Sequence, residues 1–220
     1  MNSVPLYSWA DSISRRIIRY LFPDEKYDYL EKARRLVKLG KYSEAKDIYN
    51  YLISKYPDSF WIHMDLAYYY ICNNKYDEAI IECNKARKMK SSETYCIIMY
   101  VYILLQKMEY GKAIEELSSF VNLNPKYELA HEYMGYAYFG MNDYNNAIKY
   151  LNKAKMLGGK SGELYFNLGN SYEIKGNNDY AVIEYKKAIN QFRKNNKINL
   201  VSDIMKRINK LQCVSPVVIK

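Results

Sequence analysis

Few residues of this chain have the types and the spacing that catalysis requires. The tripeptide Gly159-Lys160-Ser161 resembles the end of a phosphate-binding loop, in which backbone N–H groups and a lysine hold phosphate. That motif needs an earlier glycine at position 154, where this chain has Ala154. The tripeptide therefore predicts no nucleotide site, and we expect the protein to need no cofactor.

Histidine and cysteine, which could ligate a metal or supply a nucleophile, are too dispersed to form a site. His63 and His131 are the only histidines, and they stand far apart in the chain. The cysteines form no Cys-x-x-Cys pair, which favours reduced packing residues over a metal or redox centre: Cys72, Cys83, Cys96 and Cys213. Carboxylates such as Glu115 and Glu116 fit solvated helix faces. We therefore expect no catalytic residues, no metal ligands and no enzymatic activity.

A motif that recurs at a fixed interval dominates the chain instead. An alanine returns every 34 residues, and in the first four copies a tyrosine stands three residues before it. The alanines are Ala45, Ala79, Ala113, Ala147 and Ala181. A fixed period of this size indicates a solenoid of helical hairpins, in which each repeat packs on its neighbours.

The repeats have bounds of 26–59, 60–93, 94–127, 128–161 and 162–195, each with a helix A, a turn and a helix B. The turn holds a residue that tolerates the left-handed conformation in four repeats: Gly40, Asn74, Asn142 and Gly176. Helix A carries an early small residue in most copies, at Ala33, Ala67, Val101, Gly135 and Gly169. This pattern resembles the tetratricopeptide repeat (TPR) family. The resemblance implies an all-α, right-handed superhelical solenoid of five helix-turn-helix repeats.

Two shorter segments flank the repeats. Residues 1–25 form an N-terminal segment with an expected amphipathic helix at about 9–22. Its apolar side holds Trp9, Ile13, Ile17, Tyr20 and Leu21, and its basic side holds Arg15, Arg16 and Arg19. Residues 196–220 predict a capping helix followed by a loose tail, because apolar residues recur at helical spacing at Leu200, Val201, Ile204, Ile208 and Leu211. Where the N-terminal helix packs, in a groove, on repeat one or on a membrane, stays open.

The charge distribution bears on partners and compartment. The formal net charge of +9 suggests anionic partners, but by whole repeats the excess lies at the two ends. A nucleic-acid groove would be basic along its length, so nucleic acid is disfavoured as a partner. Peripheral membrane contact through the basic N-terminal helix remains an expectation. With no run of about 18 apolar residues and no signal-peptide pattern, the chain is expected to be soluble and cytoplasmic.

One stripe of helix A predicts a binding groove. The second, fifth, ninth and twelfth residues of each repeat lie opposite the stripe that packs on helix B. In the TPR family that stripe lines the concave surface. The residues we expect in the peptide-binding groove are Trp61, Met64, Tyr68, Tyr95, Ile98, Tyr102, Tyr136, Phe139, Phe166 and Asn170. Helices A of repeats two and three are apolar nearly all round, so neighbouring repeats cover the stripe or something else fills it.

Three functions are compatible with these sequence features. The first is a protein-protein interaction adaptor or scaffold, which binds an apolar peptide or helix with aromatic anchors in this groove. The alternative is a self-assembling homo-oligomer that uses the N-terminal helix, since the architecture is similar to that of magnetosome-associated TPR scaffolds. RNA binding by helical repeats is the least favoured, because the pentatricopeptide period is one residue longer and the middle repeats carry no net charge.

Overall fold

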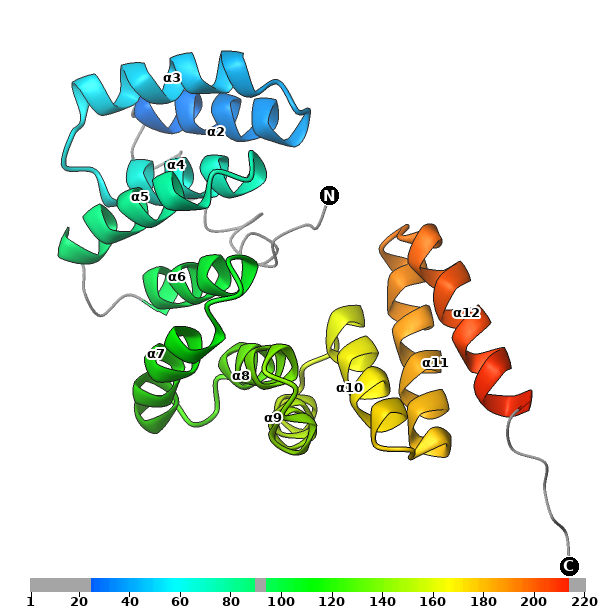
Figure 1. The fold of residues 1–220 in the computed structure, drawn as a ribbon. Helices are drawn as coiled ribbons and strands as arrows, with labels where there is room; N and C mark the ends of the chain where they lie inside the picture. The colour runs from blue at the N-terminus through cyan, green and yellow to red at the C-terminus, as the bar shows by residue number, and fades with distance from the viewer. Residues whose placement is uncertain (1–24, 90–93, 214–220) are drawn as a thin grey trace, which may run out of the picture. The chain divides into compact units, whose positions relative to one another are not determined.

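The computed structural model of the chain describes residues 25–89 and 94–213. Every regular element in those ranges is a helix, and the eleven helices carry the labels α2 to α12 (Figure 1). The chain divides into two compact units, one ending at Lys107 and the other beginning at Met108. The amphipathic helix expected at about 9–22 and the tail expected after Cys213 lie outside the described residues.

The first unit contains the helices of repeats one and two and helix A of repeat three. These are α2 (Glu25–Lys38), α3 (Tyr42–Lys55), α4 (Phe60–Cys72), α5 (Tyr76–Met89) and α6 (Thr94–Gln106). The paired helices α2 and α3 pack on each other, as do α4 and α5 (Figure 1). Apolar residues from α2, α3 and α4 form one core, which includes Leu30, Tyr49, Leu52, Ile62 and Tyr69.

The second unit contains helix B of repeat three, repeats four and five, and the terminal helix. These are α7 (Tyr110–Leu123), α8 (Glu128–Gly140), α9 (Tyr144–Met156), α10 (Gly162–Ile174), α11 (Asn178–Lys194) and α12 (Ile198–Cys213). The helix-turn-helix pairing predicted from the sequence is confirmed for α8 with α9 and for α10 with α11. The predicted capping helix is α12, which buries Val201, Ile204 and Ile208.

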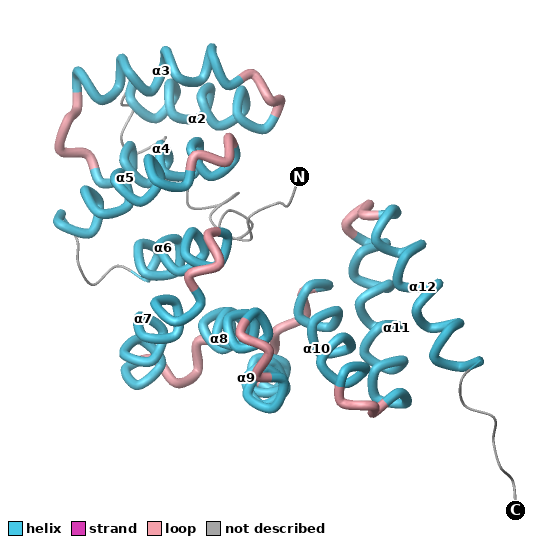
Figure 2. The backbone as a smooth tube through the Cα atoms, in the orientation of Figure 1, coloured by secondary structure: helices cyan, strands magenta, loops and turns pink. Residues whose placement is uncertain are grey.

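The turns between paired helices follow the predicted chemistry (Figure 2). Gly40, Asn74, Asn142 and Gly176 all have positive φ, between 55° and 76°. In repeat three, Met108 takes the left-handed conformation, with φ of 59°. Glycine and asparagine adopt this conformation readily, whereas another L-residue pays about 1–2 kcal/mol, so no sequence signal marks Met108. The division between the two units falls at this turn.

The recurring small residues are explained by contacts between paired helices. All five alanines of the period are fully buried. So is the residue four places after each of them, a set that sequence analysis did not single out: Tyr49, Cys83, Leu117, Leu151 and Tyr185. An added Cβ at Gly135 would lie 2.5 Å from Cγ of Leu151, and one at Gly169 would lie 2.5 Å from Cδ1 of Tyr185. The large residue of helix B therefore requires a small one on helix A in these two repeats.

Removing the hydroxyl group from each of two equivalent tyrosines of this set, Tyr49 and Tyr185, is expected to have opposite effects on the stability of the protein. The Tyr185 hydroxyl lies within hydrogen-bonding distance of two acceptors for its one proton, Oδ1 of Asn170 at 2.7 Å and Oε2 of Glu173 at 2.5 Å, whereas the buried hydroxyl of Tyr49 has no partner among the described residues. We expect Tyr185→Phe to cost about 1.5–3 kcal/mol, since it removes hydrogen bonds that include a carboxylate, and Tyr49→Phe to stabilise the protein by about 1 kcal/mol. Equilibrium urea unfolding followed by circular dichroism measures both. Equal destabilisation by the two substitutions would contradict the hydrogen bonding described.

Candidate interaction site

In the first unit, the predicted groove stripe begins with a pair of aromatic residues on α4 and α6. The indole of Trp61 is 41% exposed, and its ring lies edge-on to that of Tyr95, with centroids 6.0 Å apart. Phe60 supports the indole from the side at 4.9 Å. Trp61 and Tyr95 occupy the same place in successive repeats, so the repeat packing brings equivalent stripe residues into contact as the period predicts.

The remaining stripe residues of this unit differ in burial. Met64 and Ile98 are buried, and Sγ of Cys96 lies 3.4 Å from Sδ of Met64. Tyr68 and Tyr102 are half-buried. Burial raises the pKa of the Tyr68 hydroxyl, and the nearby Cys72 and Tyr102 add to the rise. Met64 and Ile98 thus serve packing, whereas the aromatic members of the stripe retain exposed surface.

Repeat one contributes a charged residue to the same stripe. Arg34, at the ninth place of its repeat, donates from Nε to Oδ2 of Asp65 at 2.7 Å, and its Nη2 forms an ion pair with the same oxygen at 2.7 Å. Asp65 is only 1% exposed. This ion pair was not predicted from the sequence, because Asp65 stands outside the stripe pattern. The pair ties α2 to α4.

In the second unit, the stripe residues belong to a polar network. The hydroxyl of Tyr136 donates to the buried Glu132, which also accepts from Oγ of Ser161 at 2.5 Å. Burial raises the pKa of Glu132, although these two hydrogen bonds act in the opposite direction. Phe139, half-buried, lies with its ring centroid 5.6 Å from that of Tyr144. This part of the stripe is therefore largely committed to internal contacts.

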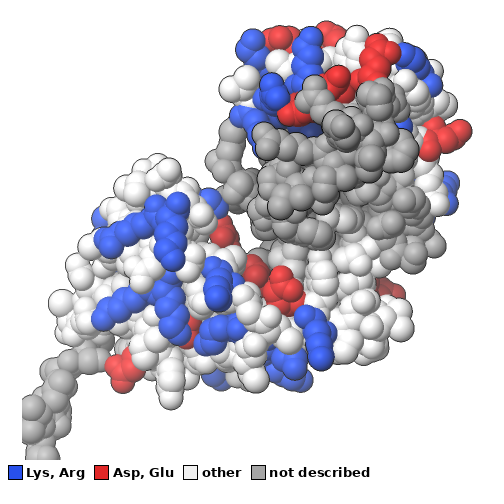
Figure 3. Space-filling view, turned by 180° about the vertical axis from the view of Figure 1, so that it is seen from behind, with Lys and Arg blue, Asp and Glu red and all other residues white. Residues whose placement is uncertain are grey.

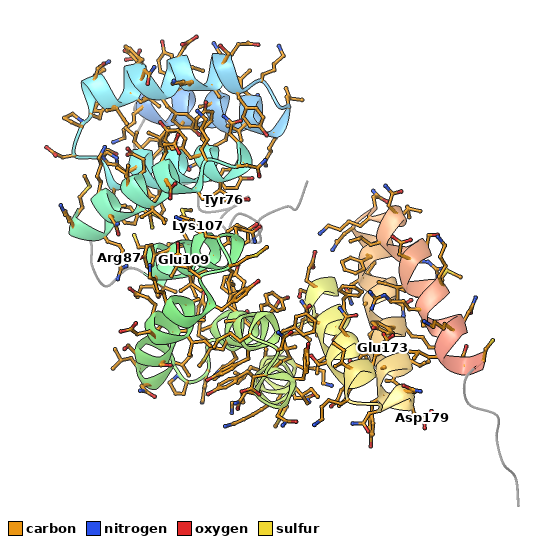
Figure 4. All side chains as sticks on the ribbon, viewed as in Figure 1. Tyr76, Arg87, Lys107, Glu109, Glu173 and Asp179 are labelled. Atoms are coloured by element: carbon orange, nitrogen blue, oxygen red, sulfur yellow. The ribbon has the colours of Figure 1, made fainter. Side chains whose placement is uncertain are left out.

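The terminal helix completes that network. Oδ1 of Asn170 accepts from Tyr185 and, at 2.9 Å, from Nη1 of Arg207 on α12. The Arg207 guanidinium also lies 5.8 Å from the ring centroid of Phe166 and 3.5 Å from the carboxylate of Glu173, a residue labelled in Figure 4. Arg207 was not among the site residues predicted from the sequence. The available signal was that the 34-residue register continues past residue 195, which places Arg207 one period after Glu173.

The two histidines lie in internal contacts. His63 on α4 faces Oε2 of Glu82 at 2.6 Å with Nδ1 and the carbonyl oxygen of Pro57 at 2.8 Å with Nε2. His131 on α8 faces the carbonyl oxygen of Pro125 at 2.9 Å with Nε2. Among the described residues, no three His, Cys, Asp or Glu side chains gather as metal ligands. The four cysteines are free thiols.

The helices described here, 25–89 and 94–213, include none that is both long and apolar enough to cross a lipid bilayer.

Helical hairpins in a 34-residue register, with an exposed aromatic residue on α4, define a helical-repeat protein of the interaction-scaffold class. The chain belongs to the tetratricopeptide repeat family. Tetratricopeptide repeat families match residues 30–93, and also 134–157 and 162–195. These matches include most of repeats one, two, four and five, and the predicted membership is confirmed.

Several solved structures have the same fold. A tetratricopeptide repeat protein from Parabacteroides merdae is 16% identical, with a TM-score of 0.71 over 87% of this chain and 75% of that one. A thermophilic TPR protein of Thermus thermophilus is 18% identical, with a TM-score of 0.67 over 86% of this chain and 99% of that one. MamA (residues 41 to the end) from Desulfovibrio magneticus RS-1 is 19% identical, with a TM-score of 0.63 over 78% of this chain and 97% of that one. No curated protein matches the chain.

Proposed function

We propose that this protein is a non-enzymatic interaction scaffold that binds an apolar peptide or helix across the aromatic stripe of α4 and α6. The observation that carries the proposal is the exposed indole of Trp61, which is held edge-on by Tyr95. An indole is large and has few rotatable bonds, so ordering it against a partner costs little entropy. Phe60 and Tyr95 already restrict this one.

The half-buried Tyr68 and Tyr102 extend the same stripe along α4 and α6. Aromatic anchors surrounded by packed neighbours are the usual centres of binding energy in protein interfaces. The partner expected from this chemistry has two or three apolar or aromatic side chains spaced along a helix or an extended strand.

Self-assembly is the second candidate, because the chain contains a segment of the required chemistry. The sequence places Trp9, Ile13 and Ile17 on one side of an amphipathic helix. In this alternative, that segment occupies the aromatic stripe of the same or a neighbouring molecule.

The test uses peptides selected on the protein itself. A phage-displayed random peptide library is panned against the full chain, and the dissociation constant of the best synthetic peptide is measured by fluorescence anisotropy. We expect Trp61→Ala to raise that constant by about thirtyfold, because truncating a central aromatic anchor costs about 2 kcal/mol or more. Tyr51→Ala is the matched control, since Tyr51 on α3 is 40% exposed, and it should leave the constant unchanged.

Light scattering after size-exclusion chromatography separates the two candidates. Self-assembly predicts a homo-oligomer that becomes smaller both on removal of residues 1–22 and with Trp61→Ala. Binding of an external partner predicts that neither change alters the number of chains per particle, which is the measured mass divided by the mass of one chain. If the selected peptides bind the wild type and Trp61→Ala equally, the aromatic stripe is not the site.

A further inference from the structure

In repeats four and five, basic residues gather on the two helices B, α9 and α11, although α11 also carries Asp179 and Glu184. In repeats four and five, helices A carry Glu128, Glu132, Glu163 and Glu173. Residues 144–161, which span the first helix B and the loop after it, carry four lysines and no Asp or Glu. When charges are summed over a whole repeat, the acidic residues of helix A offset the basic residues of helix B. The repeats therefore looked nearly neutral from the sequence alone.

Six basic side chains of α9, its following loop and α11 form what we name the basic face: Lys149, Lys153, Lys160, Lys186, Arg193 and Lys194. All six are exposed, and none makes an ion pair within the described part of the chain. On each helix they lie in the half opposite the buried residues, which are Ala147, Leu151 and Ala154 on α9 and include Ala181, Tyr185 and Ala188 on α11. Figure 3 shows a face of this unit on which Lys and Arg predominate over Asp and Glu.

Comparison between repeats shows why the face is unbalanced. Lys187 pairs at 2.9 Å with Glu184, three residues before it, and Lys85 pairs at 2.8 Å with Glu82 in the same arrangement. Lys153 occupies the equivalent place in repeat four, but there Tyr150 replaces the glutamate. Glu184 is itself buried and also binds Lys155 at 3.0 Å, so it is compensated within the fold and leaves the surrounding charges unneutralised.

We propose that the basic face docks the protein on an anionic lipid surface. Clusters of four to eight Lys or Arg are attracted to anionic headgroups, and lysine suits a diffuse negative surface as a compact point charge. Met156, 80% exposed, and Ile183, 48% exposed, lie on the outer sides of the same helices, where they can enter the headgroup region. Both helices belong to one hairpin array and present the charges on rigid elements.

A nucleic acid is the competing polyanion, and the aromatic residues of these helices disfavour it. Binding of single strands relies on aromatic rings that stack with bases. Tyr150 is half-buried and stacked on Tyr138, with centroids 5.3 Å apart, and Tyr180, although 61% exposed, is stacked on Tyr172 at 5.4 Å. Only one of the six basic residues is an arginine, the residue whose planar fork suits phosphate and base edges. This docking surface is separate from the aromatic stripe of the proposed function.

The test is co-sedimentation of the full chain with phosphatidylcholine vesicles that contain about 30% phosphatidylglycerol, at about 0.15 M salt. The test variant combines Lys153→Glu, Lys186→Glu and Lys194→Glu. The control combines Lys38→Glu, Lys46→Glu and Lys88→Glu, three exposed lysines of the first unit with no ion pair in the described residues. Both variants have the same net charge and retain the N-terminal segment. A difference in vesicle binding between them therefore reports the contribution of the basic face.

We expect the wild type and the control to sediment with these vesicles and not with pure phosphatidylcholine. The test variant should lose about a hundredfold or more in partition coefficient, because each basic residue near the surface contributes roughly a factor of five. Surface substitutions of this kind should leave thermal unfolding nearly unchanged, which circular dichroism checks. Equal losses in both variants, no preference for anionic vesicles, or tighter binding to polyuridylic acid than to vesicles at the same salt would overturn the proposal.

Discussion

Replacing Asp65 with alanine is expected to destabilise the first unit by about 3–5 kcal/mol, as is usual when one partner of a buried ion pair is removed. Both Arg34 contacts to Oδ2 of Asp65 are 2.7 Å long, and the Asp65 side chain is almost inaccessible. Without this carboxylate, the guanidinium loses its principal acceptor in a site with little water. The measurement is equilibrium urea unfolding followed by tryptophan fluorescence, in a Trp9→Phe background so that the signal comes from Trp61, which lies on the same helix as Asp65.

The control is an exposed ion pair of the same length. Arg35 Nη2 lies 2.7 Å from Oε1 of Glu31 on the surface of α2, and Glu31→Ala should cost only about 0.3–0.5 kcal/mol. The double replacement Arg34→Met with Asp65→Leu should recover much of the loss, because apolar residues often replace a buried ion pair without penalty. If Asp65→Ala shifts the unfolding midpoint no more than Glu31→Ala does, the contact does not stabilise the unit.

The second large effect is expected at His63, and it depends on pH. Both ring nitrogens of His63 face acceptors, the Glu82 carboxylate and the carbonyl oxygen of Pro57, so the geometry favours the doubly protonated ring. The hydrogen bond to Glu82 raises the pKa of His63, against an opposing effect of burial. Burial acts to raise the pKa of Glu82, but the hydrogen bonds from His63 and Lys85 outweigh it and the pKa is lowered.

The two shifts define a pH window for this stabilisation. The raised pKa of His63 means that its contribution is fully present below the ordinary value of 6.5 and is lost as the pH rises through the folded-state value. The lowered pKa of Glu82 means that its contribution is fully present above the ordinary value of 4.5 and is lost as the pH falls through the folded-state value. The pair therefore stabilises most between these two ordinary values.

Glu82→Gln should remove about 3 kcal/mol or more in this window, because it leaves a buried imidazolium without its carboxylate, and the difference from wild type should shrink toward alkaline pH. Unfolding free energies measured from about pH 5 to about pH 9 follow the effect. His131→Gln is the matched control. His131 also bonds a proline carbonyl, but its ring stacks on Tyr150 with centroids 6.2 Å apart. A pH dependence that survives Glu82→Gln and disappears in His131→Gln would contradict the assignment.

The period of the alanines was enough to predict the family, the helical hairpins and four of the five turns between paired helices. These features depend on local backbone preferences and on the spacing of apolar residues, both of which are properties of the sequence. The turn at Met108 was not predictable, because a bulky residue carries no left-handed preference. The sequence also identified the aromatic stripe, but not which of its members are exposed.

The tertiary structure decided how the stripe residues are used. Trp61 and Met64 belong to one stripe and both contact α6, yet Trp61 presents its indole to solvent and Met64 is buried, because the neighbouring repeat covers the two side chains to different extents. Asp65 with Arg34, and Arg207 with Asn170, pair across 31 and 37 residues. Such pairs depend on how successive hairpins stack, which no local pattern specifies. The same stacking separates acidic helices A from the basic face, and whole-repeat charge sums conceal that separation.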